Sequence, residues 1–251
     1  MKIIGHRGAS GYKPENTLSS FRQALKLGVD MIEFDVYTVK SGEVMVLHDD
    51  KLDRTTNGTG SIESKTFTEI RKLDAGGGEK VPLLTEVLDT INKKVPINIE
   101  LKGTGTAGPV AAIIQHYVTK KGWPRKLFLV SSFDHDELKA FTTLLPTIPT
   151  GALFGYLPFR FWPKIKDTGV TSANISAKAV TRRAVNAVHA HGLEVYVYTV
   201  NSKRQADRMA RLGVDGIFSN FPDKVSGSNA IVRTPKLQKL VTTKKAFARV
   251  S

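Results

Sequence analysis

The stretch KIIGHRGASGYKPENTLSSFRQALKLG, at residues 2–28, contains a short strand, a polar loop and a helix. The β-branched pair Ile3 and Ile4 favours a strand that Gly5 ends. Asn16 or Thr17 can cap the helix, and Gly28 ends it.

The same alternation continues along the chain. Further helical patterns cover 111–122, 134–145, 181–192 and 202–213, and we expect strands at 2–5, 30–36, 95–101, 127–132, 150–154, 172–176, 194–200 and 215–219. Eight strands separated by helices predict an α/β protein with a closed (β/α)8 TIM barrel. A doubly wound open sheet is the alternative.

Composition excludes several kinds of chemistry. The 251 residues include no cysteine, so disulfides, thiolate metal sites and cysteine nucleophiles are excluded. We find no secretory leader pattern and no run of about 18 apolar residues that could span a bilayer. We therefore expect a soluble cytoplasmic protein.

The chain is strongly basic. It has 37 Lys and Arg against 23 Asp and Glu, a net charge of +14, which favours anionic partners such as phosphates, nucleic acid or a membrane surface. No nucleic-acid-binding motif accompanies this charge, so we expect no nucleic-acid partner.

Six of the cations lie in a tail at 226–251, which contains no acidic residue; we divide the chain into a barrel domain at 1–225 and this tail. Thr234 can cap a tail helix with Leu237, Leu240 and Val241 on one face. Such a basic amphipathic helix predicts weak contact with an anionic membrane. The alternatives are a tail packed on the barrel or a disordered tail.

One run interrupts the alternation. Residues 43–50, EVMVLHDD, follow the second strand across KSGE, which resembles a hairpin turn. A two-residue turn at Ser41 and Gly42 would pair Lys40 with Glu43 and set His48 opposite Asp35. Residues 49–80 then form an insertion after the second strand, placed as a small cap on the catalytic rim.

Acidic residues mark the second and third strands. Glu33 and Asp35 are two residues apart and share a face of the second strand, and Glu100 and Lys102 repeat this spacing in the third. Three carboxylates from neighbouring strands are a candidate site for a divalent metal ion, Ca²⁺ or Mg²⁺. With Arg7 and Lys102 beside it, such a site suits a phosphoryl group.

Of six histidines, His6 and His48 follow strands beside these carboxylates and are candidates for a general acid and a general base. The other four are expected to be structural (His189 and His191), solvated (His116), or a minor candidate at the start of a helix on the rim (His135).

Taken in order, these motifs resemble those of glycerophosphodiester phosphodiesterases. The matching segments are HRGASGYKPENT (6–17), EFDV (33–36), VLHDDKLDRTTNGTG (46–60), INIELKG (97–103) and GVDGIFSNFPD (213–223). The resemblance implies a TIM barrel with the family's insertion and hydrolysis of glycerophosphodiesters to glycerol 3-phosphate and an alcohol.

The resemblance also implies roles for individual residues. His6 and His48 match the acid–base pair, Glu33, Asp35 and Glu100 the metal ligands, and Arg7 and Lys102 the cations that bind the substrate phosphate. It implies attack on phosphorus by the substrate's own glycerol hydroxyl, followed by hydrolysis of a cyclic phosphate. Tyr198 stands where the family usually has tryptophan, and Thr85 where it usually has an acidic residue.

Two other functions are considered. The loop GYLPFRFWP at 155–163 offers Phe159, Phe161 and Trp162 as an apolar entrance for an acyl chain, which would suit phospholipase D-type hydrolysis of lysophospholipids. Packing of this loop and the next helix is the alternative explanation. The net charge would also suit a non-catalytic barrel that binds polyanions.

Overall fold

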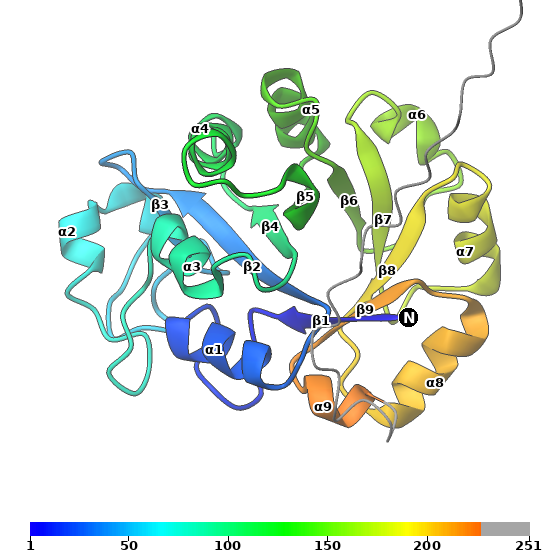
Figure 1. The fold of residues 1–251 in the computed structure, drawn as a ribbon, viewed down its shortest axis with the longest axis horizontal. Helices are drawn as coiled ribbons and strands as arrows, with labels where there is room; N and C mark the ends of the chain where they lie inside the picture. Colours follow the sequence, from blue (N-terminus) through cyan, green and yellow to red (C-terminus); the bar gives the residue numbers. More distant parts are fainter. Residues whose placement is uncertain (227–251) are drawn as a thin grey trace, which may run out of the picture.

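Eight parallel strands close into a barrel in the computed structural model, which describes residues 1–226 (Figure 1). The barrel strands are β1 (Lys2–His6), β2 (Met31–Thr38), β4 (Ile97–Leu101), β5 (Phe128–Ser132), β6 (Thr150–Phe154), β7 (Val170–Ser176), β8 (Glu194–Tyr198) and β9 (Gly216–Ser219). Each pairs with the next, and β1 closes the ring by pairing with both β2 and β9. The predicted closed barrel is confirmed, and the open sheet is wrong.

Helices surround the strands (Figure 1). They are α1 (Leu18–Lys26), α3 (Leu84–Ile91), α4 (Ala107–Thr119), α5 (His135–Leu144), α6 (Trp162–Ile165), α7 (Arg182–His189), α8 (Lys203–Leu212) and α9 (Pro222–Val225). Thr17 caps α1 by accepting a hydrogen bond from the Ser20 backbone N–H. All eight predicted strands and the five helices predicted between them are present within residues 1–226, whereas α3, α6 and α9 were not predicted.

The apolar core has two layers. Between strands and helices lies a large cluster that includes Phe21, Phe34 and Phe141, all fully buried. Inside the barrel is a smaller cluster of Ile4, Met31, Leu129, Tyr196 and Phe218. This inner layer fills the barrel below the polar ends of the strands, so the barrel is a packed support for a site and not a pore.

The predicted hairpin register is wrong by one residue. Strand β3 (Val44–Val46) is antiparallel to β2, with Thr38 opposite Val44 and Val36 opposite Val46. The turn has three residues, 40–42, because Gly42 takes a left-handed conformation with φ +97° and Val39 N–H bonds to Glu43 C=O at 2.9 Å. Lys40 therefore does not pair with Glu43, and Leu47 instead of His48 bonds to the Asp35 carbonyl, at 3.1 Å.

The segment between β3 and α3 has a small core of its own. It contains the 3-10 turn η1 (Ile62–Ser64) and the short helix α2 (Phe67–Ile70), which Thr66 and Glu69 cap reciprocally. Leu52, Ile62, Ile70 and Val81 are buried together against Met45 and Tyr37 of the hairpin. The segment projects from one side of the barrel beside β2 and β3 (Figure 1).

Within residues 1–226 we find no helix that is both long enough and apolar enough to cross a bilayer. The predicted tail helix and its membrane contact lie outside the described residues.

Candidate active site

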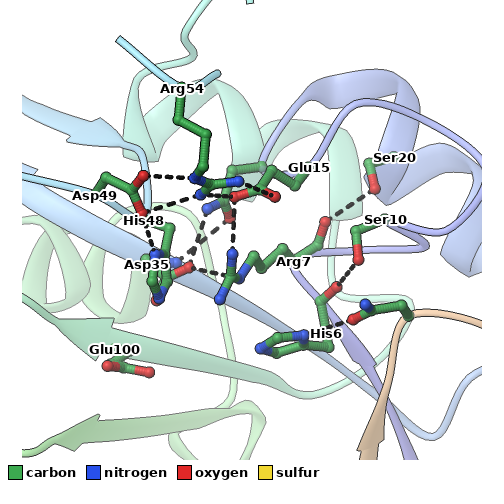
Figure 2. Close-up of polar contacts among 12 residues, drawn as sticks. His6, Arg7, Ser10, Glu15, Ser20, Asp35, His48, Asp49, Arg54 and Glu100 are labelled. Atoms are coloured by element: carbon green, nitrogen blue, oxygen red, sulfur yellow. Dashed lines mark hydrogen bonds and ion pairs between the residues drawn. The ribbon is translucent and has the colours of Figure 1, made fainter. Parts of the chain in front are cut away.

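The predicted site residues come together at the carboxyl ends of β1, β2 and β4, which are adjacent in the barrel (Figure 2). Cα pairing sets His6 level with Glu33 and Asp35 level with Glu100. Since the side chains of residues two apart point to the same side of a strand, Glu33, Asp35 and Glu100 share the barrel interior.

The three carboxylates form one buried cluster. Glu33, Asp35 and Glu100 are 2%, 1% and 7% exposed, and each offers an oxygen within 4.8 Å of the others. Glu33 accepts a hydrogen bond from the Arg7 backbone N–H at its Oε2, at 2.8 Å. Its Oε1 is buried and accepts no hydrogen bond from the described residues. An oxygen in that state needs a cation or a proton.

The pKa values of the cluster reflect this crowding. Burial, followed by repulsion from Asp35, raises the pKa of Glu33 well above its usual value and that of Glu100 to about 7. Burial also opposes ionisation of Asp35, but Lys102 and Arg7 outweigh it and lower the pKa of that carboxyl. Bringing all three carboxylates to the ionised state therefore requires more positive charge than these two side chains supply.

Arg7 and Lys102 flank the cluster. Lys102 Nζ lies 2.6 Å from Glu100 Oε1 and 3.3 Å from Asp35 Oδ1. Arg7 Nη1 donates to Glu15 Oε1 at 2.8 Å, and its Nε lies 3.6 Å from Asp35 Oδ2. Arg7 Nε is buried and donates no hydrogen bond to a described residue, so this donor can turn to an anion.

A tight turn after β1 places Arg7. Arg7 and Gly8 both have positive φ, +55° and +82°. A Cβ atom at Gly8 would lie 2.7 Å from the backbone carbon of Ser20, so no other residue fits there without movement of α1. Ser20 Oγ donates to the Arg7 carbonyl at 2.9 Å, which joins the turn to the helix (Figure 2).

His6 is the last residue of β1, and its surroundings keep it neutral. Its Nδ1 lies 2.6 Å from Asn220 Oδ1, beyond the end of β9. An amide oxygen can only accept a hydrogen bond, so Nδ1 carries the proton and Nε2 is left as a base. Burial, with help from the charge on Arg7, lowers the pKa of His6 to about 4.

His48 has a charged partner instead. It follows β3 on the strand-to-insertion connection, and its Nδ1 lies 2.5 Å from Asp49 Oδ1. A carboxylate that accepts a hydrogen bond from Nδ1–H fixes the tautomer and the orientation of the ring. His6 and His48 therefore have different surroundings although both approach the carboxylate cluster (Figure 2).

The remaining histidines lie apart from this cluster. His116 is exposed on α4, and His189 bonds to Asp215 at 2.8 Å, at the opposite end of the barrel. His191 stacks on Trp162 with ring centroids 4.4 Å apart. His135 begins α5 and lies 3.3 Å from the Leu153 carbonyl.

Several residues at the site were not predicted. Asn16 donates to Asp35 Oδ2 at 3.0 Å, and Asn220 contacts His6. Glu15, Asp49 and Arg54 form ion pairs above Arg7 and His48. All five lie in loops, where no periodic pattern marks the direction of a side chain, although each falls within a segment that resembles the phosphodiesterase motifs.

The aromatic loop is only partly as predicted. Phe161 is buried against Phe154, and Trp162 stacks on His191, so these two pack the loop and do not line an entrance. Phe159 is 89% exposed and Tyr156 is 73% exposed, and both follow β6 on the rim that carries the site. Phe133, half-exposed after β5, lies under Lys102, with Nζ 5.8 Å from its ring centre.

Neither of the two departures from the family pattern, at Tyr198 and Thr85, removes a candidate catalytic residue. Tyr198 ends β8, donates to the Phe154 carbonyl at 2.8 Å and packs edge-on against Phe133. Thr85 lies in α3, where its carbonyl accepts a hydrogen bond from the Tyr117 hydroxyl.

The carboxylate cluster fits a hard divalent cation. It offers oxygen atoms alone, which Ca²⁺ and Mg²⁺ prefer, and one of them has no hydrogen-bond donor among residues 1–226. Three carboxylates against the two cations Arg7 and Lys102 leave one negative charge in excess when all are ionised. A divalent ion would reverse that sign and prepare the site for an anion.

Comparison with known proteins agrees with this site. Residues 6–224 match the Glycerophosphoryl diester phosphodiesterase family. A glycerophosphodiester phosphodiesterase of Bacillus altitudinis is 38% identical over 240 residues, covering 89% of this chain and 96% of the relative. A solved phosphodiesterase of Oleispira antarctica, in complex with the product sn-glycerol-3-phosphate, is 31% identical with a TM-score of 0.83, covering 90% and 95%. Human lysophospholipase D is 26% identical over 266 residues, covering 89% of this chain and 84% of that one.

The chain therefore belongs to the glycerophosphoryl diester phosphodiesterase family. It is a phosphoric diester hydrolase, which removes the non-catalytic polyanion-binding barrel as an interpretation.

Proposed function

We propose that this protein hydrolyses glycerophosphodiesters to glycerol 3-phosphate and an alcohol, with a divalent ion held by Glu33, Asp35 and Glu100. The observation that carries the proposal is the buried carboxylate cluster flanked by Arg7 and Lys102 and approached by two imidazoles with different surroundings. The product bound to the Oleispira relative supports the choice of substrate.

The charges at the site explain how a phosphodiester would be recognised. Its single negative charge would be bound by Arg7, whose Nε donor is unused within residues 1–226, and by Lys102. A bound Ca²⁺ or Mg²⁺ would supply a Lewis acid that offsets the charge developing on the phosphoryl oxygens. The buried position of the carboxylates strengthens each of these interactions, because little water is present to screen them.

His6 is assigned as the general base of the first step. Its neutral ring, with Nδ1 directed at Asn220, presents Nε2 to the proton of the substrate's own glycerol hydroxyl. That oxygen attacks phosphorus, and the bond from phosphorus to the alcohol oxygen breaks. His48, whose ring Asp49 orients, gives a proton to the departing alcohol.

The second step reverses these roles. His48, now neutral, accepts a proton from a water molecule that attacks the cyclic phosphate. His6 returns its proton to the glycerol oxygen that leaves phosphorus. Each imidazole ends in its starting state, and one water has been consumed for one glycerol 3-phosphate and one alcohol.

A substrate panel tests the proposal. Glycerophosphocholine, glycerophosphoethanolamine and glycerophosphoglycerol are supplied to the full chain with Ca²⁺, with Mg²⁺ or with EDTA, and glycerol 3-phosphate is measured. We expect its release from at least one diester, and loss of release in EDTA. Glu33→Gln should lose both turnover and bound metal by elemental analysis, whereas Glu43→Gln at the hairpin tip should keep both. Full turnover of metal-free enzyme would contradict the metal assignment.

Exposed aromatic side chains favour a second candidate, phospholipase D-type hydrolysis of lysophospholipids. Phe159 and Tyr156 extend from the rim, and one relative is a lysophospholipase D. An acyl chain would need such an apolar surface outside the polar site. Phe159→Ser should then lower kcat/KM for a lysophosphatidylcholine and leave that for glycerophosphocholine unchanged. Leu144→Ser, an exposed apolar residue at the end of α5, is the matched control.

A further inference from the structure

A single guanidinium joins two carboxylates above the site (Figure 2). Arg54, in the insertion, donates to Asp49 from Nε at 2.5 Å and from Nη2 at 3.0 Å. It also donates to Glu15 from Nη1 at 3.0 Å and from Nη2 at 2.7 Å. Two hydrogen-bonding edges of the planar guanidinium are therefore used, an arrangement that lysine cannot reproduce.

Each of those carboxylates holds a residue that we assign to the reaction. Asp49 contacts His48 Nδ1 at 2.5 Å, and Glu15 Oε1 accepts from Arg7 Nη1 at 2.8 Å. A continuous chain of contacts thus runs from His48 through Asp49, Arg54 and Glu15 to Arg7. Arg54 has no contact with Glu33, Asp35 or Glu100 among its recorded hydrogen bonds and ion pairs within residues 1–226.

We propose that Arg54 is a positioning residue, which fixes His48 for proton transfer and Arg7 for phosphate binding through its two carboxylate partners. This inference rests on the function proposed above and adds to it a role for the insertion. The insertion would supply the element that couples the two groups, because Asp49 and Arg54 lie in it whereas Glu15 and Arg7 lie in the loop before α1.

The consequence of losing Arg54 follows from electrostatics. Glu15 and Asp49 would face each other without the shared cation, and two carboxylates so placed repel. Asp49 would turn from His48, and the imidazole would lose the acceptor that fixes its tautomer. Small misplacement of a catalytic group can cost about 10²-fold in rate.

The insertion offers a matched control. Arg71 also makes a two-pronged ion pair, from Nη1 and Nη2 to Glu86 at 2.6 and 2.5 Å, and it is comparably exposed, at 36% against 49% for Arg54. Glu86 belongs to α3 and contacts none of the assigned site residues in its recorded hydrogen bonds within the described chain. Arg71→Gln therefore removes a similar ion pair from the same segment without reaching His48.

The test compares two leaving groups in the full chain. From glycerophosphocholine, choline leaves as an alkoxide that needs a proton. From glycerophospho-p-nitrophenol, p-nitrophenol leaves as a stable phenolate that needs none. Release of the alcohol is measured in a single turnover, which reports the first step and not the hydrolysis of the cyclic phosphate that both esters share. We expect Arg54→Gln to lower this rate for the choline ester by about tenfold or more and to lower that for the nitrophenyl ester far less. Arg54→Lys should stay nearer to Arg54→Gln than to the wild type, because one ammonium cannot bind both carboxylates in two-pronged pairs. Arg71→Gln should act on both esters at the wild-type rate.

A second readout does not depend on turnover. The Nδ1–H proton of His48, held by Asp49, is followed by NMR with labelled histidine in the wild type and both glutamine variants. We expect Arg54→Gln to lose or shift that signal and Arg71→Gln to retain it. An unchanged signal, or equal loss of the first-step rate on both esters, would overturn the positioning of His48 by Arg54. Failure of the wild type to act on glycerophosphodiesters would overturn the proposed function, while the NMR comparison would still decide whether Arg54 positions His48.

Discussion

His6 and His48 both follow strands in the sequence, but the structure gives one an amide partner and the other a carboxylate. If both act on one transition state, each His→Asn change should lower the rate by about 10²-fold or more. The double variant should fall only slightly below the slower single variant, since losses within one catalytic unit do not add. His116→Asn, at an exposed position on α4, is the control. Near-native turnover in either single variant would remove that histidine from the mechanism.

The burial of His6 also predicts a pH effect on stability. Its pKa is lowered to about 4, so between about 6.5 and 4 the unfolded chain binds this proton and the folded chain does not. Stability should therefore fall as the pH falls through this window. In EDTA, acidification from about pH 7 to about pH 4.5 should cost the wild type about 2 kcal/mol more than it costs His6→Asn, by urea unfolding. Equal losses in the two proteins would show that His6 is accessible to protons when folded.

For single residues, the sequence predicts the direction of a side chain where the residue belongs to a strand. Glu33, Asp35 and Glu100 could be assigned to one face because the strand period is two residues. Glu15, Arg54 and Asn220 could not be placed by the same means, since loop backbones have no period and their partners lie far along the chain. The link from Asn220 to His6 spans 214 residues.

The turn of the β2–β3 hairpin contains one residue, Gly42, in a conformation that favours glycine. Gly42 has φ +97° and a Cβ atom there would meet nothing, so Gly42→Ala measures the backbone conformation alone. We expect it to destabilise the protein by about 1 kcal/mol. Gly155→Ala, at a glycine with equally open space but no positive φ, should instead stabilise it by up to about 1 kcal/mol. Urea midpoints of the two variants should move in opposite directions.

Elements with a clear period were predicted, and the others were missed for physical reasons. Helices α6 and α9 have four residues each, too few to complete a pattern of 3.6 residues per turn. Helix α3 follows directly after the irregular insertion, and Leu83 at its start offers no polar side-chain cap. The hairpin register failed because Ser41–Gly42 suits a two-residue turn as well as the three-residue turn observed.

For the molecule as a whole, the position of its charge leads to a prediction about membranes. Six of the fourteen net charges belong to residues beyond the described barrel. We propose that they give the enzyme weak affinity for anionic lipid, each cation near the surface contributing about 1 kcal/mol. In vesicle co-sedimentation at low salt, the full chain should pellet with anionic lipid but not with neutral lipid. A chain that ends at Ser226 should stay in the supernatant with either lipid. Equal binding by the two proteins would assign the affinity to the barrel.

The closure of the barrel by β1 and β9 has a further consequence, for the timing of biosynthesis. His6 is among the first residues to be made, yet its neighbouring strand begins at Gly216 and its partner is Asn220. At cellular rates of about 5–20 residues per second, the ribosome needs roughly 10–40 s to travel from one to the other. During that interval the growing chain contains most of the proposed site residues but has an open strand edge on β1. We therefore expect that the protein acts on a diester only after its last strand has been translated, and that a chain ending before Gly216 is inactive.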